Sequence, residues 1–175
     1  MQLLAISGSL RAKSTNTALL RALSRFTPTG TDIVVYSEMG ELPIFNPDLE
    51  GDLTPPSVLI LAGYVGNSDG LVVCSPEYAH GIPGGIKNLF DWLVSRFEAI
   101  DKPILLLHAS HRGDIALEAL HEVLRTLSRN TVPEVSIRVP LMSLSSREVE
   151  EIVGRPEYAE MISNGLRKFV ESIRS

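Results

Sequence analysis

The stretch QLLAISGSLRAKSTNT, residues 2–17, decides the fold of this chain. Its first part, Gln2–Ser7, is a short and nearly continuous apolar run, which predicts a buried β-strand. Gly8 then breaks the run, and a polar loop leads into Thr17–Arg25, where leucines recur at helical spacing. A buried strand that passes through a polar loop into a helix is the repeating unit of parallel α/β folds.

The same alternation continues along the rest of the chain. Further strands are predicted at Asp32–Tyr36, Gly70–Ser75, Ile104–His108 and Val135–Val139. Further helices are predicted at Ser57–Val65, Gly84–Phe97, Asp114–Ser128 and Pro156–Ile173, and the Pro-rich stretch Glu41–Pro56 is expected to be a long irregular loop. Because parallel strands are joined by right-handed crossovers, these elements predict a doubly wound five-stranded sheet. We expect a three-layer α/β/α sandwich in one domain, residues 1–175.

The composition excludes several classes of function. The net charge is −5 without any basic run, which argues against a nucleic-acid partner. The single cysteine, Cys74, lies in an apolar run and is expected to be buried; no disulfide within the chain and no Cys/His zinc spacing is possible. The apolar N-terminus ends at Gly8, too soon for a membrane span or a signal peptide. We therefore expect a cytoplasmic protein that uses neither a membrane nor a metal.

The loop after the first strand carries the donors of a phosphate site. Ser9, Ser14 and Asn16 offer side-chain donors, and Arg11 can hold a phosphate through two parallel hydrogen bonds. The N-terminus of the following helix adds its dipole. Lys13 either adds charge or points to water. One of residues 14–16 is also expected to cap the helix. The loop has neither the Walker A ending nor the Gly-x-Gly-x-x-Gly dinucleotide pattern.

The loop after the third strand suits a flat heterocycle. Residues 75–88 contain two prolines and three glycines, which give a fixed path and points of close approach. Tyr78 and His80 are placed to flank a ring. His80 has three other interpretations: a proton donor, a group that orients the substrate, or an exposed residue without a role.

Three groups of residues in this chain match one known family. They are Gly8-Ser9-Leu10-Arg11 with Ser14 and Asn16, then Pro76-Glu77-Tyr78, and then Lys87-Asn88 with Asp91-Trp92. In this combination, and with the loop Pro43–Asp48, the chain resembles the NADPH-dependent FMN reductases over most of its length. This family includes azo-dye, quinone and chromate reductases. The resemblance implies a flavodoxin-like fold with strand order 2-1-3-4-5. It also implies bound FMN, NADPH or NADH as electron donor, and a homodimer or homotetramer.

The resemblance also assigns the site. It implies that the loop after the first strand holds the FMN phosphate and that Pro76–Gly81 lies against the isoalloxazine ring. The family typically has a small glycine-rich loop after the fourth strand, where this chain has Ala109–Asp114. In that loop Ser110 still suits the flavin, while His111 and Arg112 either suit a nicotinamide-cofactor phosphate or crowd the ring. The expected cofactor-binding residues are Ser9, Arg11, Ser14, Thr15, Asn16, Pro76, Glu77, Tyr78, His80, Gly81 and Ser110.

The expected activity is hydride transfer from NADPH or NADH to bound FMN and then to a small acceptor: a quinone, an azo compound, a metal oxyanion or free flavin. One site used in turn by both substrates predicts ping-pong kinetics. The flavin carries the chemistry, so no side chain is expected to be catalytic. Two alternatives stay open. One is a flavodoxin-type electron carrier, which would have an acidic surface around its flavin. The other is a flavin-less binding or regulatory module on the same fold.

Overall fold

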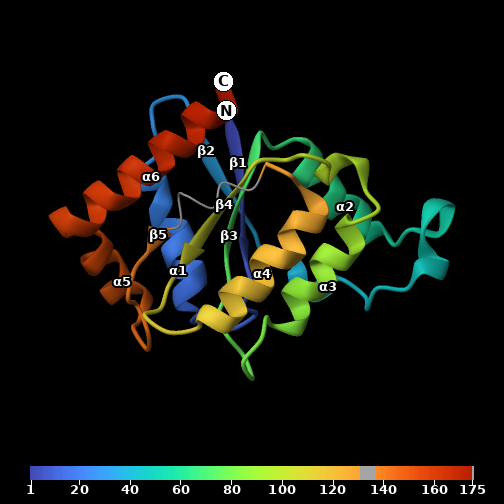
Figure 1. The fold of residues 1–175 in the computed structure, drawn as a ribbon, viewed down its shortest axis with the longest axis horizontal. Helices are drawn as coiled ribbons and strands as arrows, with labels where there is room; N and C mark the ends of the chain where they lie inside the picture. The colour runs from blue at the N-terminus through green and yellow to red at the C-terminus, as the bar shows by residue number, and fades with distance from the viewer. Residues whose placement is uncertain (131–136, 175) are drawn as a thin grey trace.

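A five-stranded parallel sheet forms the centre of the molecule (Figure 1). The computed structural model describes residues 1–130 and 137–174. The strands are β1 (Gln2–Ser7), β2 (Asp32–Tyr36), β3 (Gly70–Cys74), β4 (Ile104–His108) and β5 (Ile137–Arg138), and their order is β2-β1-β3-β4-β5, which confirms the expected order. Leu3 and Leu4 of β1 face opposite cores. Because both faces of the sheet are covered, its strands are apolar at nearly every position.

Helices cover the two faces and complete the expected three-layer sandwich (Figure 1). One layer consists of α1 (Thr15–Ala22), α5 (Ser146–Val153) and α6 (Pro156–Arg174). The other consists of α2 (Pro56–Gly66), α3 (Gly84–Leu93) and α4 (Asp114–Leu127). All described strand pairs are parallel, so the carboxyl ends of the strands meet at one edge of the sheet. The loops that follow β1, β3 and β4 therefore gather at that edge.

Two helix boundaries differ from the predicted ones because of local hydrogen bonds. α1 begins at Thr15, two residues before the predicted start, because Ser14 caps it. The predicted end of α3 at Phe97 is wrong: the helix ends at Leu93, and Phe97–Ala99 forms the 3-10 turn η5. The backbone N–H of Arg96 donates to the Leu93 carbonyl, which closes a turn that cannot continue the helix. Of the predicted strand Val135–Val139, residues 135–136 lie outside the described residues.

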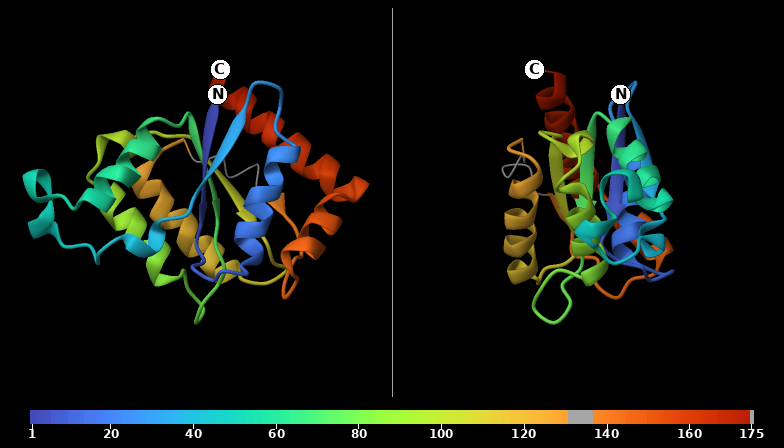
Figure 2. Two further views of the ribbon diagram at one scale, coloured as in Figure 1. Left: turned by 180° about the vertical axis from the view of Figure 1, so that it is seen from behind. Right: turned by 90° about the vertical axis from the view of Figure 1, so that its right-hand side faces the viewer.

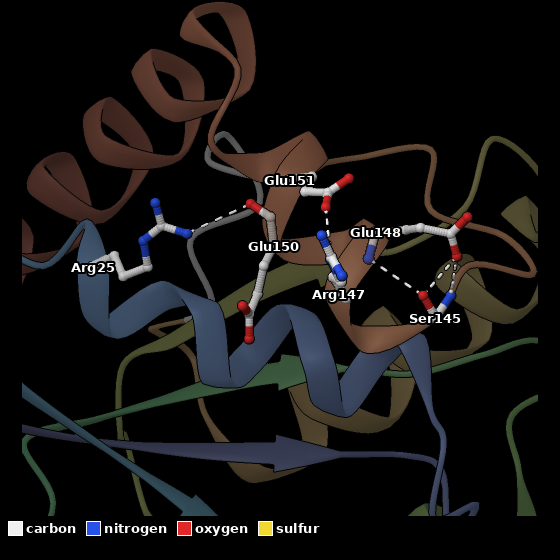
Figure 3. A network of polar contacts seen from close by, with 6 residues as sticks. All are labelled: Arg25, Ser145, Arg147, Glu148, Glu150 and Glu151. Atoms are coloured by element: carbon white, nitrogen blue, oxygen red, sulfur yellow. Dashed lines mark hydrogen bonds and ion pairs between the residues drawn. The ribbon is translucent and has the colours of Figure 1, made fainter.

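Helix α5 was not predicted from the sequence. Its N-terminus is a capping box in which Ser145 Oγ accepts from the Glu148 N–H at 3.3 Å and the Ser145 N–H donates to the Glu148 carboxylate at 2.8 Å (Figure 3). Figure 3 also shows the Arg25 guanidinium donating to the Glu150 carbonyl at 3.5 Å. Arg25 ends the 3-10 turn η1 (Leu23–Arg25) that continues α1. This contact ties α5 to α1.

The Pro-rich segment between β2 and α2 projects from the body of the molecule (Figures 1 and 2). The expected irregular loop is confirmed, and it contains the short 3-10 turns η2 (Met39–Glu41), η3 (Pro47–Leu49) and η4 (Gly51–Leu53). Its base is fixed to α3, because Asn88 Nδ2 and Trp92 Nε1 both donate to the Pro43 carbonyl, at 2.9 and 2.8 Å. This contact gives Asn88 and Trp92 a structural role.

Candidate functional site

A cavity of about 620 Å³ opens at the carboxyl edge of the sheet. This is the edge where doubly wound sheets bind ligands. Four segments line the cavity, from the loops after β1, β3 and β4 and from the connection between β5 and α5. The lining residues are Ser9, Arg11, Lys13, Ser14, Thr15, Asn16, Ser75, Pro76, Glu77, Tyr78, Ala109, Ser110, Arg112, Gly113, Met142, Ser143, Leu144 and Ser145. Of the residues expected to bind a cofactor, all but His80 and Gly81 lie along it.

The loop after β1 begins with a close approach of two backbones. The Gly8 N–H donates to the Cys74 carbonyl at 2.8 Å, so the loop leaves the sheet against the end of β3. A Cβ at Gly8 would lie 2.3 Å from Ser75 Oγ and 3.0 Å from Ser75 Cα. Any other residue would therefore push the two loops apart.

Polar side chains of this loop are buried beneath the cavity. Ser14 Oγ accepts from the Thr17 N–H at 3.3 Å and so caps α1, which was one of the expected roles of residues 14–16. The Cys74 thiol donates to Asn16 Oδ1 at 3.1 Å. Burial raises the pKa of Cys74 to about 12, so the thiol keeps its proton and remains a donor. The Asn16 amide is held with its oxygen toward Cys74, which leaves its nitrogen as a donor for the cavity that Asn16 lines.

The loop after β3 folds back in a tight turn. Tyr78 and Gly81 exchange two backbone hydrogen bonds of 3.0 Å. Between them Ala79 and His80 have φ of 50° and 57°, the left-handed region that costs a residue with a Cβ about 1–2 kcal/mol. The His80 side chain in this turn is 83 % exposed and does not line the cavity. Tyr78 instead lines the cavity, and its hydroxyl lies 3.5 Å from Ser9 Oγ of the first loop.

Glu77 connects the loop after β3 to helix α4. The N-cap of α4 is Gly113, which has no side chain to accept a hydrogen bond. Glu77 Oε2 takes that role by accepting from the Ala116 N–H at 3.0 Å. Gly113 has φ of 97°, and a Cβ there would lie 3.3 Å from Glu77 Cβ. The bare glycine is therefore what lets Glu77 reach the helix, and its carboxylate is occupied by this bond.

The loop after β4 is held by its own polar contacts. The Arg112 N–H donates to Ser110 Oγ at 3.0 Å, and the Arg112 carbonyl accepts from His108 Nε2. A carbonyl can only accept, so this bond requires the tautomer of His108 with a proton on Nε2. Ser110 keeps its own hydroxyl proton for the cavity. The Arg112 side chain, expected either to bind a phosphate or to crowd the ring, lines the cavity.

The connection between β5 and α5 was missed as part of the site. Met142, Leu144 and Ser145 line the cavity together with Ser143, whose φ of 63° lies in the left-handed region. The sequence offered one signal, the capping box that begins at Ser145. The place of this segment beside the loop after β4 follows from the pairing of β5 with β4.

Comparisons with known proteins agree with this geometry. The family model described as NADPH-dependent FMN reductase matches residues 1–140. Quinone reductase of Escherichia coli K12 is 32% identical over 114 residues, which are 63% of this chain and 60% of that protein. The NADH:(hydroxy)cinnamate reductase subunit CrdA of Vibrio ruber is 34% identical over 112 residues, 63% of this chain and 54% of that protein. The matches thus span 60% or less of the length of these two curated relatives.

A solved structure shares the fold of this chain. The structure of FerB, a flavoenzyme NAD(P)H:(acceptor) oxidoreductase from Paracoccus denitrificans, superposes with a TM-score of 0.77 at 24% identity and covers 99% of this chain and 97% of that one. This likeness confirms the flavodoxin-like architecture. The family match covers most of the chain, including the loops after β1, β3 and β4, and confirms the resemblance seen in the motifs. This chain belongs to the NADPH-dependent FMN reductase family.

Proposed function

We propose that this chain, as one domain of residues 1–175, binds FMN non-covalently and transfers electrons from NADPH or NADH to a small acceptor such as a quinone. One observation carries the proposal: a single cavity joins the hydroxyl- and arginine-rich loop after β1 to the loops after β3 and β4. A cofactor with a phosphate at one end and a flat ring at the other needs this continuity. The volume of about 620 Å³ lies in the usual range of cofactor sites.

The phosphate would bind at the N-terminus of α1. Ser9, Arg11, Ser14, Thr15 and Asn16 line this part of the cavity. Arg11 has no ion-pair partner among the described residues, so its guanidinium is available for a dianion. The Asn16 amide nitrogen, oriented by Cys74, supplies a neutral donor. These groups fit a phosphate monoester.

The flat ring would lie between the loops after β3 and β4. Pro76, Tyr78 and Ser110 line this part of the cavity, and Glu77 fixes the distance between the two loops. When bound, FMN supplies the hydride chemistry, and the protein supplies orientation and electrostatics. The roles of His80 and Gly81 in binding stay predictions, since both residues lie outside the cavity wall.

The charge of the cavity supports a reductase over an electron carrier. Its lining contains Arg11, Lys13 and Arg112 against the single acid Glu77. A flavodoxin-type carrier would have an acidic surface at this place. A cationic cavity instead attracts small anionic substrates such as a dinucleotide.

The visible absorbance of the purified protein tests the proposal. It would be recorded first alone, then with FMN, and then with NADPH in the absence of oxygen. We expect a flavin spectrum that bleaches when NADPH is added. A flavin spectrum that NADPH leaves unchanged would indicate a carrier, and a protein that takes up no FMN would contradict the proposal.

Arg11→Gln tests the phosphate site separately. Hydrogen bonds to charged groups contribute about 1.5–3 kcal/mol, so FMN affinity should fall about ten- to a hundredfold. Riboflavin lacks the phosphate, so its affinity should change by less than about twofold on the same reasoning. Arg129→Gln, which removes an exposed arginine that does not line the cavity, is the matched control. Equal losses for FMN and riboflavin would place Arg11 outside the phosphate site.

We further propose a homodimer or homotetramer. Helix α2 contains no charged residue, and its side chains Leu59 and Ile60 are each 49% exposed. Phe97 and Ile100, which follow α3, are 77% and 63% exposed. Helices that are apolar on all sides are normally buried, which favours a protein partner for this surface. Light scattering should give the mass of two or four copies, and Ile60→Glu should shift the protein toward the monomer.

Location remains a prediction. Among the described residues, no helix is long and apolar enough to cross a membrane. We keep the cytoplasm as the expected compartment.

A further inference from the structure

We infer that Arg112 forms an anion subsite for the second substrate, so that the site favours substrates that carry a phosphate or a carboxylate. This inference rests on the proposed function, which defines FMN as the resident cofactor. It concerns the molecule that enters the cavity after FMN.

The cavity has more positive charge than an FMN phosphate requires. Arg11, Lys13 and Arg112 line it, and none of the three has an ion-pair partner in the described part of the chain. A phosphate monoester carries a charge of about −1.5 to −2 at neutral pH. Arg11 and the N-terminus of α1 are placed to balance that charge. The charge of Arg112, on a different loop, remains for another anion.

The acids near Arg112 are already paired. Glu77 accepts from the Ala116 N–H and lies 3.5 Å from the His80 ring. Asp114 pairs with Arg138 of β5, and the hydrogen bond from Arg138 holds the pKa of Asp114 below its ordinary value. Neither carboxylate therefore neutralises the Arg112 guanidinium.

The backbone of Arg112 is anchored on both sides while its side chain is free. Its N–H donates to Ser110 Oγ, and its carbonyl accepts from His108, a side chain that is 3% exposed. Gly113 follows with φ of 97°, where a Cβ would lie 3.2 Å from His108 Cε1. The loop therefore has little freedom to carry the arginine away from the cavity. A guanidinium on a fixed backbone loses less conformational entropy when it binds a ligand.

A guanidinium recognises carboxylate and phosphate groups in the same bidentate way. A phosphate would belong to the dinucleotide donor, and a carboxylate would belong to an aromatic acceptor. Equilibrium binding of unreactive probes separates these two sources. NADP⁺ and NAD⁺ differ in one phosphate, and benzoate and benzamide differ in one charge.

The experiment titrates FMN-loaded wild type and Arg112→Gln with each of the four probes and follows the flavin absorbance. We expect the variant to bind NADP⁺ or benzoate about ten- to a hundredfold more weakly, since hydrogen bonds to charged groups contribute about 1.5–3 kcal/mol. Benzamide should bind equally to both proteins. Arg112→Lys, which keeps the charge, should recover part of the loss, and Arg129→Gln should match wild type.

The pattern of loss identifies the anion. If Arg112→Gln binds only NADP⁺ more weakly, Arg112 contacts the 2′-phosphate. If both dinucleotides bind more weakly, it contacts the pyrophosphate. If benzoate binds more weakly, it contacts a carboxylate. Unchanged binding of all four probes, or equal weakening of benzamide, would overturn the inference. So would an FMN affinity of Arg112→Gln that falls as far as that of Arg11→Gln, because Arg112 would then belong to the FMN phosphate site.

Calorimetry on the flavin-free chain separates failure of this inference from failure of the proposed function. If the chain does not bind FMN but binds NADP⁺ or benzoate through Arg112, the inferred subsite is supported and the proposed reductase function is wrong. A chain that binds neither FMN nor any probe would overturn both.

Discussion

Removing the Glu77 side chain should loosen helix α4 at the edge of the cavity. In Glu77→Ala the Ala116 N–H loses the carboxylate that it contacts at 3.0 Å, and Gly113 offers no replacement. A lost N-cap costs about 1 kcal/mol. A lost negative charge at a helix N-terminus adds about 0.3–1 kcal/mol, and the side chain is only 23% exposed, so screening by water is incomplete. We expect a total destabilisation of about 1–2 kcal/mol.

Thermal unfolding followed by circular dichroism measures this loss. For a chain of this length, 1 kcal/mol corresponds to about 2–4 °C in Tm, so Glu77→Ala should unfold about 2–8 °C lower. Glu77→Gln keeps an acceptor and removes only the charge, so it should lose only about 0.3–1 kcal/mol. Hydrogen exchange at the Ala116 amide should accelerate in both variants. Glu160→Ala, on the exposed face of α6, is the control. An unchanged Tm together with unchanged Ala116 exchange would refute the assignment of Glu77 as the cap of α4.

Three further predictions follow from local geometry. Hydrogen bonds from Ser145 hold the pKa of Glu148 below its ordinary value of 4.5, so its contribution to stability is present above that pH and lost as the pH falls through the lowered value. In Glu148→Gln the free energy of unfolding should therefore fall less steeply toward acid pH than in wild type. Denaturant titrations at several pH values that show the same fall for both proteins would contradict this. Cys74 should not react with a thiol reagent at pH 8 until the protein unfolds, because burial raises its pKa to about 12; fast labelling of the native protein would disprove its burial. Ala79→Asn should raise stability by about 0.5–1 kcal/mol in the same titrations, because asparagine tolerates the left-handed region better than alanine. Ala12→Asn, in an exposed loop outside the positive-φ positions, should leave the stability unchanged. Equal effects of the two substitutions would show that Ala79 is not strained.

The sheet and the first loop were predictable from local patterns. Parallel strands covered on both faces are apolar at nearly every position, so β1, β3 and β4 are visible as short apolar runs. Ser9, Arg11, Ser14 and Asn16 lie within one loop, so their common role needs no knowledge of distant contacts. The apolar patterns predicted neither the end of α3 nor helix α5. The end of α3 depends on one backbone hydrogen bond, and α5 depends on the capping box of Ser145 and Glu148.

The sequence by itself determined the fold class and the phosphate-type loop, because both depend on residues that are neighbours in the chain. Only the tertiary structure decided what Glu77 does, since the Ala116 amide that it caps lies 39 residues away. The same holds for Cys74, whose bond to Asn16 spans 58 residues, and for the segment at Met142–Ser145, which reaches the cavity because β5 pairs with β4. Such contacts join loops that meet only through the order and register of the strands. Strand order and register are properties of the assembled sheet, and no local pattern of residues contains them.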